Sequence, residues 1–294
     1  MESKTAVAPD FLAIGSFVLV VILGGANFVA VRLTLRDLAP FWGAAVRFLP
    51  ASVILLFACL LFRVPLPRGR SLAGALLFGL LNFAAFYAFA YWGLQRVQAG
   101  SAALATSTVP LLTLVLAWLQ RLEKLTIHGL AGAGLAVMGI VIIQLGHNTG
   151  EIPLASLMAF VAAAACAAES LVVLKRFRLT DPLSTNAVGM GVGGLVLLFL
   201  SFLVREPWSL PRAPEAWRAL AYLIPFGTLL LFGTQVFLVR RWSASAAAYV
   251  FVPIPIVAAA LGVLLAGERV SSWLLIGGFL ILAGVLLGVL FRSR

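Results

Sequence analysis

Charged residues are scarce in this sequence, and acidic residues are the scarcest of them. Asp, Glu, Lys and Arg make up 11% of the 294 residues, whereas 63% are hydrophobic and the mean hydropathy is +1.10. A soluble domain of this length needs far more charge to cover its surface. The scarcity excludes a soluble globular protein and indicates a chain that lies in a lipid bilayer.

The residue combinations of common catalytic and metal sites are also missing. No two acidic residues lie within six positions of each other, which removes the paired-carboxylate metal motifs of membrane prenyl-transfer enzymes. The only histidines, His128 and His147, form no H-E-x-x-H motif, and there is no G-x-x-x-x-G-K-[ST] loop. Cys59 and Cys166 fall within apolar runs as packing residues, with no disulfide framework. We therefore expect no enzymatic activity, no metal site and no cofactor.

Apolar runs recur along the chain, each long enough to cross a hydrocarbon core of about 30 Å. The runs are continuously apolar instead of alternating, so they predict helices and disfavour a barrel. The predicted fold is an all-α integral membrane protein with ten transmembrane helices and short connections. The ten spans are Phe11–Leu33, Ala39–Phe62, Ser71–Leu94, Gln98–Leu119, Thr126–Gly146, Ile152–Leu174, Leu183–Val204, Trp217–Val239, Trp242–Ala266 and Ser271–Phe291.

The net charge of +11 follows from topology, and it does not indicate nucleic-acid binding. With the N-terminus in the cytoplasm, the inside segments hold 13 of the 21 basic residues, the outside ends and loops hold 7, and Arg47 lies within a span. This bias is the positive-inside rule. It predicts a multi-pass protein of the plasma membrane (the bacterial inner membrane) with both termini in the cytoplasm.

The second half of the chain repeats the first at an offset of 145 residues. Over Gln98–Gly146 against Ser243–Phe291, 12 of 49 positions are identical without a gap. The shared residues include a proline (Pro110 and Pro255), a glutamate (Glu123 and Glu268) and two glycines (Gly132 and Gly139, Gly277 and Gly284). These residues are not generic apolar filler, so they indicate a duplication.

The duplication predicts two repeats, residues 1–148 and 149–294, with five helices each. Because five is odd, the second copy enters the membrane in the opposite sense, which makes an inverted-topology repeat. Such repeats are a basis for alternating access in transporters, with the substrate site near the midplane. Some channels and pores carry inverted repeats too, so a pore remains the alternative from another class.

These residues resemble the drug/metabolite transporter superfamily and, within it, the EamA-type carriers. The resemblance covers the whole chain and rests on the duplicated proline, glutamate and glycine pattern and on Gly24–Arg32 ("GGANFVAVR"). It implies a ten-helix secondary carrier built from two five-helix halves. The aromatic-rich third helix is most similar to that of exporters of aromatic and other large neutral amino acids. Export of drugs or other metabolites is the alternative within the superfamily.

Prolines in the middle of two spans are the predicted hinges. Pro110 lies halfway along the fourth span, where it removes a backbone hydrogen bond and clashes with the preceding turn. Hydroxyls at Thr106 and Ser107 can bind the freed carbonyl, and both are predicted to line a central cavity. Pro253 and Pro255 repeat the feature in the ninth span. The alternative is a simple packing kink.

Glu123 and Glu268 are predicted to be helix-end residues. Each precedes a helix that starts near Thr126 or Ser271, and a carboxylate there complements the positive end of the helix dipole. In inverted halves, Glu123 faces the cytoplasm and Glu268 the outside. A role in proton coupling is the alternative.

Two ionisable residues lie within spans, where a charge is costly. Glu169 is a cavity candidate that would bind a substrate ammonium or carry a proton, unless it pairs with the nearby Lys175 and Arg176. Arg47 is more simply a structural link to backbone carbonyls or to Glu169 than a partner of a substrate carboxylate.

The third span holds an unusual concentration of rings. Phe83, Tyr87 and Tyr91 share one helical face, while Asn82 falls on another. Tyr87, Tyr91 and Asn82 are candidates to line a cavity, where the rings would stack on a planar side chain or hold an ammonium group. The alternative, an interfacial aromatic belt, suits Tyr91 better than Tyr87.

The family resemblance adds three cavity candidates, Asn27, Gln235 and Tyr249, because it places helices one, three, four, six, eight and nine around the cavity. Two pairs of glycines four residues apart, Gly189 with Gly193 and Gly284 with Gly288, indicate close helix packing. The expected partners are the bilayer and a small-molecule substrate such as an amino acid. We expect a monomer or a weak homodimer.

Overall fold

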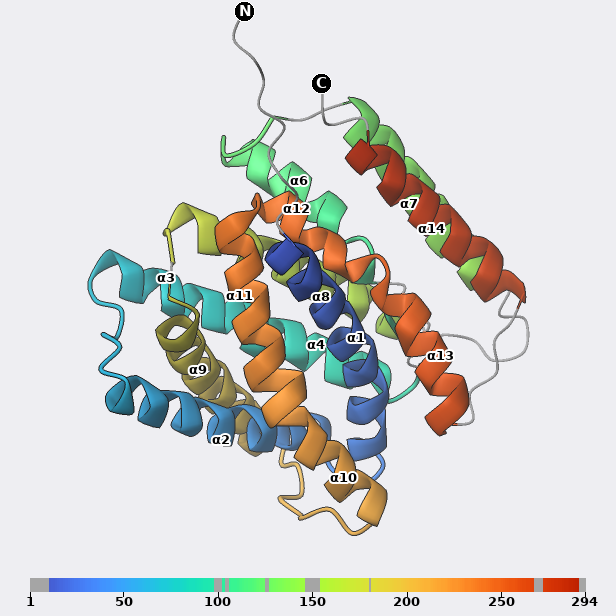
Figure 1. Cartoon of the computed structure of the whole chain (residues 1–294). Helices are drawn as coiled ribbons and strands as arrows, with labels where there is room; N and C mark the ends of the chain where they lie inside the picture. Colours follow the sequence, from blue (N-terminus) through green and yellow to red (C-terminus); the bar gives the residue numbers. More distant parts are fainter. Residues whose placement is uncertain are drawn as a thin grey trace, which may run out of the picture.

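The computed structural model describes residues 11–97, 102–103, 106–124, 127–145, 154–179, 181–266 and 272–290. Within these ranges every regular element is a helix (Figure 1). The helices are α1 Phe11–Thr34, α2 Pro40–Leu61, α3 Arg70–Gly79, η1 Leu80–Ala85, α4 Phe86–Leu94, α6 Val109–Leu119, α7 Ile127–Leu145, α8 Leu154–Arg176, α9 Pro182–Leu203, α10 Pro214–Leu223, η2 Pro225–Leu230, α11 Leu231–Arg241, α12 Ala244–Ala248, η3 Tyr249–Phe251, α13 Ile254–Ala266 and α14 Ser272–Leu290.

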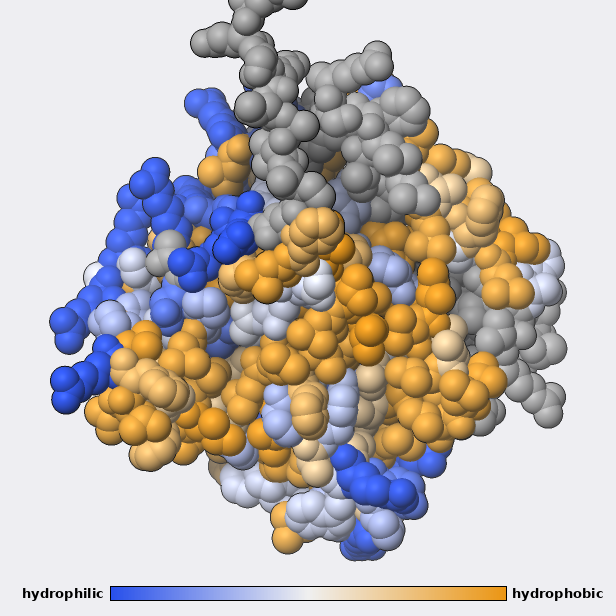
Figure 2. Space-filling view, in the orientation of Figure 1, coloured by the Kyte–Doolittle hydropathy of each residue, from blue (hydrophilic) through white to orange (hydrophobic). Residues whose placement is uncertain are grey.

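The molecule is a multi-pass membrane protein. In the described part of the chain, seven helical stretches are long and apolar enough to cross a bilayer, and Val109–Leu119 and Leu275–Gly284 are shorter apolar helices. Many large apolar side chains lie on the outside of the molecule. For example, Phe57 is 65% exposed and Phe199 is 62% exposed. Figure 2 shows them as a broad apolar surface with hydrophilic side chains gathered toward its edges. Lipid tails solvate such a surface, whereas water does not. The ten-span count stays a prediction.

Helices that are far apart in sequence pack in pairs. α2 lies against α9, and α7 lies against α14 as a pair at one side of the molecule (Figure 1). The helices α1 and α13 pack together, as do α8 and α6. Segments 145 residues apart therefore contact each other or occupy matching pairs, which is the arrangement that a duplicated chain with an internal two-fold relation would give.

Glycine allows the closest of these approaches. A Cβ atom on Gly79 of α3 would lie 2.5 Å from the carbonyl oxygen of Gly189 in α9, and one on Gly139 of α7 would lie 2.5 Å from that of Gly277 in α14. Backbones can meet this closely only without side chains. The predicted packing role of Gly189 is confirmed.

Several helix ends are capped from elsewhere in the chain. The Glu206 carboxylate, which follows α9, accepts hydrogen bonds from the Phe41 and Trp42 amides at the start of α2, at 3.2 and 2.8 Å. The Asp37 carboxylate, which follows α1, accepts from the amides of Arg212 and Ala213 just before α10, at 2.8 and 2.6 Å. Helix N-termini leave amides unsatisfied, and an acidic side chain both binds them and favours the helix dipole.

Arginine ends several helices in a conformation that glycine usually takes. Four arginines just beyond a helix have φ angles between 51° and 57°, namely Arg63, Arg121, Arg178 and Arg205. In each case the next amide bonds back to a carbonyl five residues earlier, as from Val64 to Cys59 at 2.8 Å. This is the Schellman arrangement, and a cation there also complements the carbonyl end of the helix.

The third, fourth, eighth and ninth predicted spans contain irregular segments. The predicted third and eighth spans contain six-residue π-helical segments, η1 and η2. Described residues before α6 form a turn at Ser107–Thr108, and the ninth span divides into α12, η3 and α13. The π segments start at residues 80 and 225 and the restarted helices at residues 109 and 254, so both features recur at the 145-residue offset.

Candidate substrate cavity

A cavity lies inside the bundle where α1, α2, α4, α8, α11 and α13 approach one another. It contains about 690 Å³ of space free of atoms, counting the part that opens to the outside. Most of its wall is apolar. The polar side chains that line it are Asn27, Arg47, Asn82, Tyr87, Tyr91 and Gln235. An apolar cavity with a few polar groups is the usual form of a small-molecule site.

Arg47 is the charged residue among those that line the cavity, and its side chain is 0% exposed. Its Nε donates to the Thr228 hydroxyl at 2.6 Å, its Nη2 to the Gly227 carbonyl at 2.6 Å, and its Nη1 approaches the Tyr91 hydroxyl at 3.4 Å. None of these acceptors is charged. The predicted link from Arg47 to a backbone carbonyl is confirmed, and the partner is not Glu169.

The carbonyl that Arg47 meets lies in the π-helical segment η2. A π-helix departs from the regular pattern of hydrogen bonds, and such segments occur often at functional sites. The Gly227 carbonyl in η2 accepts from Arg47 and also from Asn27 Nδ2, at 2.8 Å. Because the amide nitrogen of Asn27 makes this bond, its Oδ1 is the free end. Oδ1 is buried and has no hydrogen-bond partner.

A second buried amide, Asn82, lies in η1. Its position matches that of Gly227 in η2, 145 residues later. Asn82 Oδ1 is 3.2 Å from the Ser170 hydroxyl, which is also 2.7 Å from the Ala167 carbonyl. A hydroxyl has one hydrogen, so it cannot donate to both. In either orientation of the amide, Asn82 keeps one polar atom unpaired, and the structure has Nδ2 in that state. The cavity thus has unmet hydrogen-bonding capacity at two buried amides.

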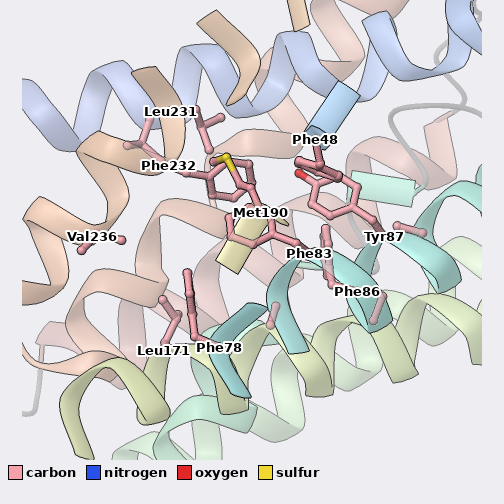
Figure 3. Close-up of a cluster of buried hydrophobic side chains, with 14 of the residues drawn as sticks. Phe48, Phe78, Phe83, Phe86, Tyr87, Leu171, Met190, Leu231, Phe232 and Val236 are labelled. Carbon is pink, nitrogen blue, oxygen red and sulfur yellow. The ribbon is translucent and has the colours of Figure 1, made fainter. Parts of the chain in front are cut away.

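Aromatic rings form one side of the cavity and continue into the core (Figure 3). Phe48 meets Tyr87 edge-on at 4.6 Å between ring centroids, and Phe232 meets Phe83 at 4.8 Å. The Arg47 guanidinium carbon lies 4.9 Å from the Phe48 ring centroid and 5.0 Å from that of Tyr87. Rings at these distances attract a cation through their faces, so they stabilise the buried charge of Arg47.

The helix face that lines the cavity differs from the predicted aromatic face, because the span contains a π segment. Asn82 and Phe86 line the cavity together with Tyr87 and Tyr91, whereas Phe83 packs into the core behind it. The interfacial-belt alternative is wrong for Tyr91, which is 1% exposed. A simple 3.6-residue period cannot describe this span because η1 changes its register.

Five of the nine predicted cavity residues line this cavity, and four lie elsewhere. Thr106 is buried and donates to the Ala103 carbonyl at 2.7 Å. Ser107 donates to the Phe251 carbonyl at 3.1 Å and so joins the two helix interruptions. Tyr249 is half-buried in η3, next to the cavity-lining Val250. Substrate contact by any of these residues stays a prediction.

Glu169 lies outside the cavity wall, in a small polar network. Both of its carboxylate oxygens are 2.8 Å from Gln120 Nε2, and the Gln120 carbonyl oxygen accepts from Arg176 at 2.9 Å. Gln120 therefore relays Glu169 to a basic residue. This geometry matches the predicted structural alternative for Glu169 more closely than a site for a substrate ammonium.

Glu123 binds the start of α12. Its carboxylate accepts hydrogen bonds from the amide and the hydroxyl of Ser245, in the first turn of α12, with the amide at 3.3 Å. The predicted cap near Thr126 lies outside the described residues, as do Glu268 and its cap at Ser271.

The prolines mark the restarts of two helices. Pro110 lies in the first turn of α6, Pro253 precedes α13 and Pro255 lies in its first turn. Proline is well tolerated in a first turn, where its missing amide has no helical partner. The predicted bend is therefore a full interruption of the helix. The hinge role itself stays a prediction.

The sequence did not single out three parts of the site. Gly227 and Thr228 supply acceptors for Arg47, and the Ser170 hydroxyl lies against Asn82 Oδ1. Pro225, two residues before Gly227, was the available signal, since proline disturbs the regular hydrogen bonds of a helix.

Comparison with known proteins identifies the type of molecule. The EamA-like transporter family matches residues 11–145 and again residues 154–290. The "Uncharacterized inner membrane transporter YedA" of Escherichia coli (strain K12) is 30% identical over 269 residues, which cover 90% of this chain and 86% of that protein. The "Probable amino-acid metabolite efflux pump" of Salmonella typhimurium is 27% identical over 289 residues, 94% of each chain.

Two further proteins are similar to this chain, a relative that is named for a function and a solved structure that shares the fold. The "Probable terminal-alkyne amino-acid exporter" of Streptantibioticus cattleyicolor is 26% identical over 277 residues, 94% of this chain and 92% of that protein. A solved structure, titled "Crystal structure of protein", has the same fold with a TM-score of 0.74 at 20% identity over 97% of each chain. The family and these relatives are named as transporters, not as enzymes. The buried cavity, the apolar exterior and a family match over both halves lead to one conclusion: this chain belongs to the EamA-like transporter family.

Proposed function

We propose that this protein is a secondary carrier that exports aromatic and other large neutral amino acids by alternating access. The observation that carries the proposal is the cavity itself, which combines an aromatic wall with unpaired amide atoms at Asn27 and Asn82. An amino-acid side chain needs apolar and aromatic contacts, and its backbone groups need hydrogen-bond partners. The names of two relatives as amino-acid exporters support the same substrate class.

The mechanism that we propose uses ten helices in two inverted repeats, residues 1–148 and 149–294, with both termini in the cytoplasm. The two separate family matches support a duplication. Paired π segments and paired helix restarts at the 145-residue offset support it further. In this arrangement, Pro110, Pro253 and Pro255 allow each half to move against the other around the central cavity.

Counterflow into proteoliposomes of the purified protein tests the proposal. Vesicles loaded with unlabelled phenylalanine should accumulate labelled phenylalanine or methionine, and the rate should saturate. A flux equal to that of empty liposomes would reject the amino-acid substrate. A non-saturating conductance would indicate a channel instead.

Export of drugs or other cationic metabolites is the second candidate within the family. Most of the cavity wall is apolar and aromatic, which suits amphipathic drugs as well. A substrate panel in the same vesicles separates the two candidates.

A further inference from the structure

We infer that Arg47 is the specificity residue that binds a carboxylate of the transported molecule. The inference rests on the proposed function and narrows it: the cavity takes solutes that carry a carboxylate, and it rejects solutes that are only cationic. The starting observation is a fully buried guanidinium that lines the cavity and has no carboxylate partner among the described residues.

A lone buried charge is an expensive arrangement in a membrane. Taking an ion out of water costs several kcal/mol unless a counter-charge or hydrogen bonds compensate. Within the described part of the chain, the groups that compensate Arg47 are a hydroxyl, a carbonyl, a distant phenol and two ring faces. These neutral groups position the guanidinium, but they leave its positive charge uncancelled.

The guanidinium also has N–H groups that are not used by the acceptors around it. Arginine has five N–H groups in a planar fork. Three of them have partners in the structure, and one of these three, toward Tyr91, spans a long 3.4 Å. A carboxylate that enters the cavity can accept from the remaining N–H groups of Nη1 and Nη2. Bonds between charged groups of this kind are about twice as strong as those between neutral groups.

Neighbouring groups fit the rest of an amino acid. The Asn27 Nδ2 donates to the same Gly227 carbonyl that accepts from Arg47. The Asn27 Oδ1 is a buried acceptor without a hydrogen-bond partner. An ammonium group needs acceptors of this kind. The rings of Tyr87 and Phe86 lie on the same wall and can contact both the ammonium and an apolar side chain.

The same charge acts against cations. The acidic residue predicted to line the cavity, Glu169, is bound to Gln120 and lies outside the cavity wall. A solute with an ammonium group but no carboxylate would enter beside an uncompensated guanidinium, and like charges in a low-dielectric site repel strongly. The cavity therefore discriminates between an amino acid and the amine that lacks its carboxylate.

The test uses two fragments of phenylalanine on the purified protein. 3-Phenylpropionate has the ring and the carboxylate, and phenethylamine has the ring and the ammonium group. In thermal unfolding at equal concentrations, 3-phenylpropionate should raise the melting temperature and phenethylamine should not. In phenylalanine counterflow, 3-phenylpropionate should inhibit at least about tenfold more strongly, as expected for hydrogen bonds to a charged group. The inference is overturned if the wild-type protein is stabilised by phenethylamine as much as by 3-phenylpropionate.

Variants assign the preference to one residue. Arg47→Gln should bring the two fragments within about twofold of each other, and Arg47→Lys should keep the sign of the preference while weakening it, because a lysine retains the charge without the fork. Glu169→Gln is the matched control and should keep the wild-type preference. An unchanged preference in Arg47→Gln would also overturn the inference. Where that variant does not fold, the wild-type comparison still decides. Absent amino-acid flux with intact carboxylate binding would reject the proposed transport and leave the role of Arg47 in place.

Discussion

Two buried polar residues of the cavity contact neutral partners from a distant part of the sequence. Arg47 in α2 is fixed by Thr228 and Gly227 in η2, and Asn82 in η1 is held by Ser170 in α8. These bonds cross between the two halves of the chain. A buried donor that loses its acceptor in a membrane cannot turn to water. The residues around Arg47 should therefore contribute to stability as well as to the cavity.

Thr228→Val tests this at the level of one hydroxyl. The substitution keeps the shape of the side chain and removes the acceptor of the Arg47 Nε–H. We expect the free energy of unfolding to fall by about 1–2 kcal/mol, measured as a lower melting temperature in detergent. Thr234→Val is the control, since Thr234 lies outside the cavity wall and its hydroxyl donates to the Leu230 carbonyl, four residues earlier in the chain. Equal melting temperatures for the two variants would contradict the anchoring role of Thr228.

Asn82, Tyr87 and Tyr91 were predictable because they are polar or aromatic within an apolar span, whereas Asn27 and Gln235 were added by the family resemblance. The same criterion also selected Thr106, Ser107 and Glu169, which do not line the cavity. Asn27, Asn82, Tyr87, Tyr91 and Gln235 all reach the cavity. The pairing of Arg47 was only partly predictable, because its acceptor is a backbone carbonyl. A carbonyl is present at every residue, so no side-chain pattern reveals which carbonyl accepts the hydrogen bond from Arg47.

Helices of this protein are interrupted at matching places in the two halves. η1 and η2 lie within the third and eighth spans, and α6 and α13 begin next to Pro110 and Pro255. The spans themselves were predictable from hydrophobicity alone, with described ends mostly within three residues of the expected ones. The interruptions were not, because a π segment and a regular helix have the same apolar composition. Close glycine contacts hold the interrupted helices against their neighbours.

Gly79→Ala should disturb the contact between α3 and α9. The new Cβ would lie 2.5 Å from the Gly189 carbonyl oxygen, and backbone cannot move aside as a side chain can. Overpacking of this kind costs about 1–3 kcal/mol, so the melting temperature should fall. Gly233→Ala is the control, since a Cβ there would meet nothing within 4 Å. If both alanine variants melt at the wild-type temperature, the close approach of α3 and α9 is wrong.

Replacement of both Pro110 and Pro255 with alanine tests the hinge. Alanine lets α6 extend toward its N-terminus and removes one of the two prolines at the start of α13, so both interruptions are weakened. We expect the counterflow rate to fall, because hinge residues absorb the backbone change between the two access states, with little change in melting temperature. Pro50→Ala, in the interior of α2 and away from the cavity, should leave transport unchanged. A double variant that transports at the wild-type rate would reject the hinge.

The molecule combines an apolar exterior with polar edges (Figure 2) and an internal, mostly apolar cavity that carries a few polar groups. Composition was sufficient to predict a membrane protein, and the repeated proline and glutamate were sufficient to point to its family. Orientation depends on the charges of short connections, so it is a separate prediction that needs its own measurement.

Cysteine labelling from outside the cell tests the orientation. In a background with Cys59→Ala and Cys166→Ala, Arg212→Cys should react with a membrane-impermeant maleimide, and Arg68→Cys should react only after the membrane is opened. Both arginines are exposed in connections between helices, and the positive-inside rule places them on opposite sides. Reaction of both positions from outside would contradict the predicted topology.

Phenylalanine counterflow in proteoliposomes, measured against rising concentrations of unlabelled phenylalanine, tests the central claim most directly. The account predicts uptake that saturates and that depends on phenylalanine loaded inside the vesicles, as expected for a carrier with one central cavity. Uptake no greater than that of protein-free liposomes, or a flux that rises linearly without saturation, would contradict it.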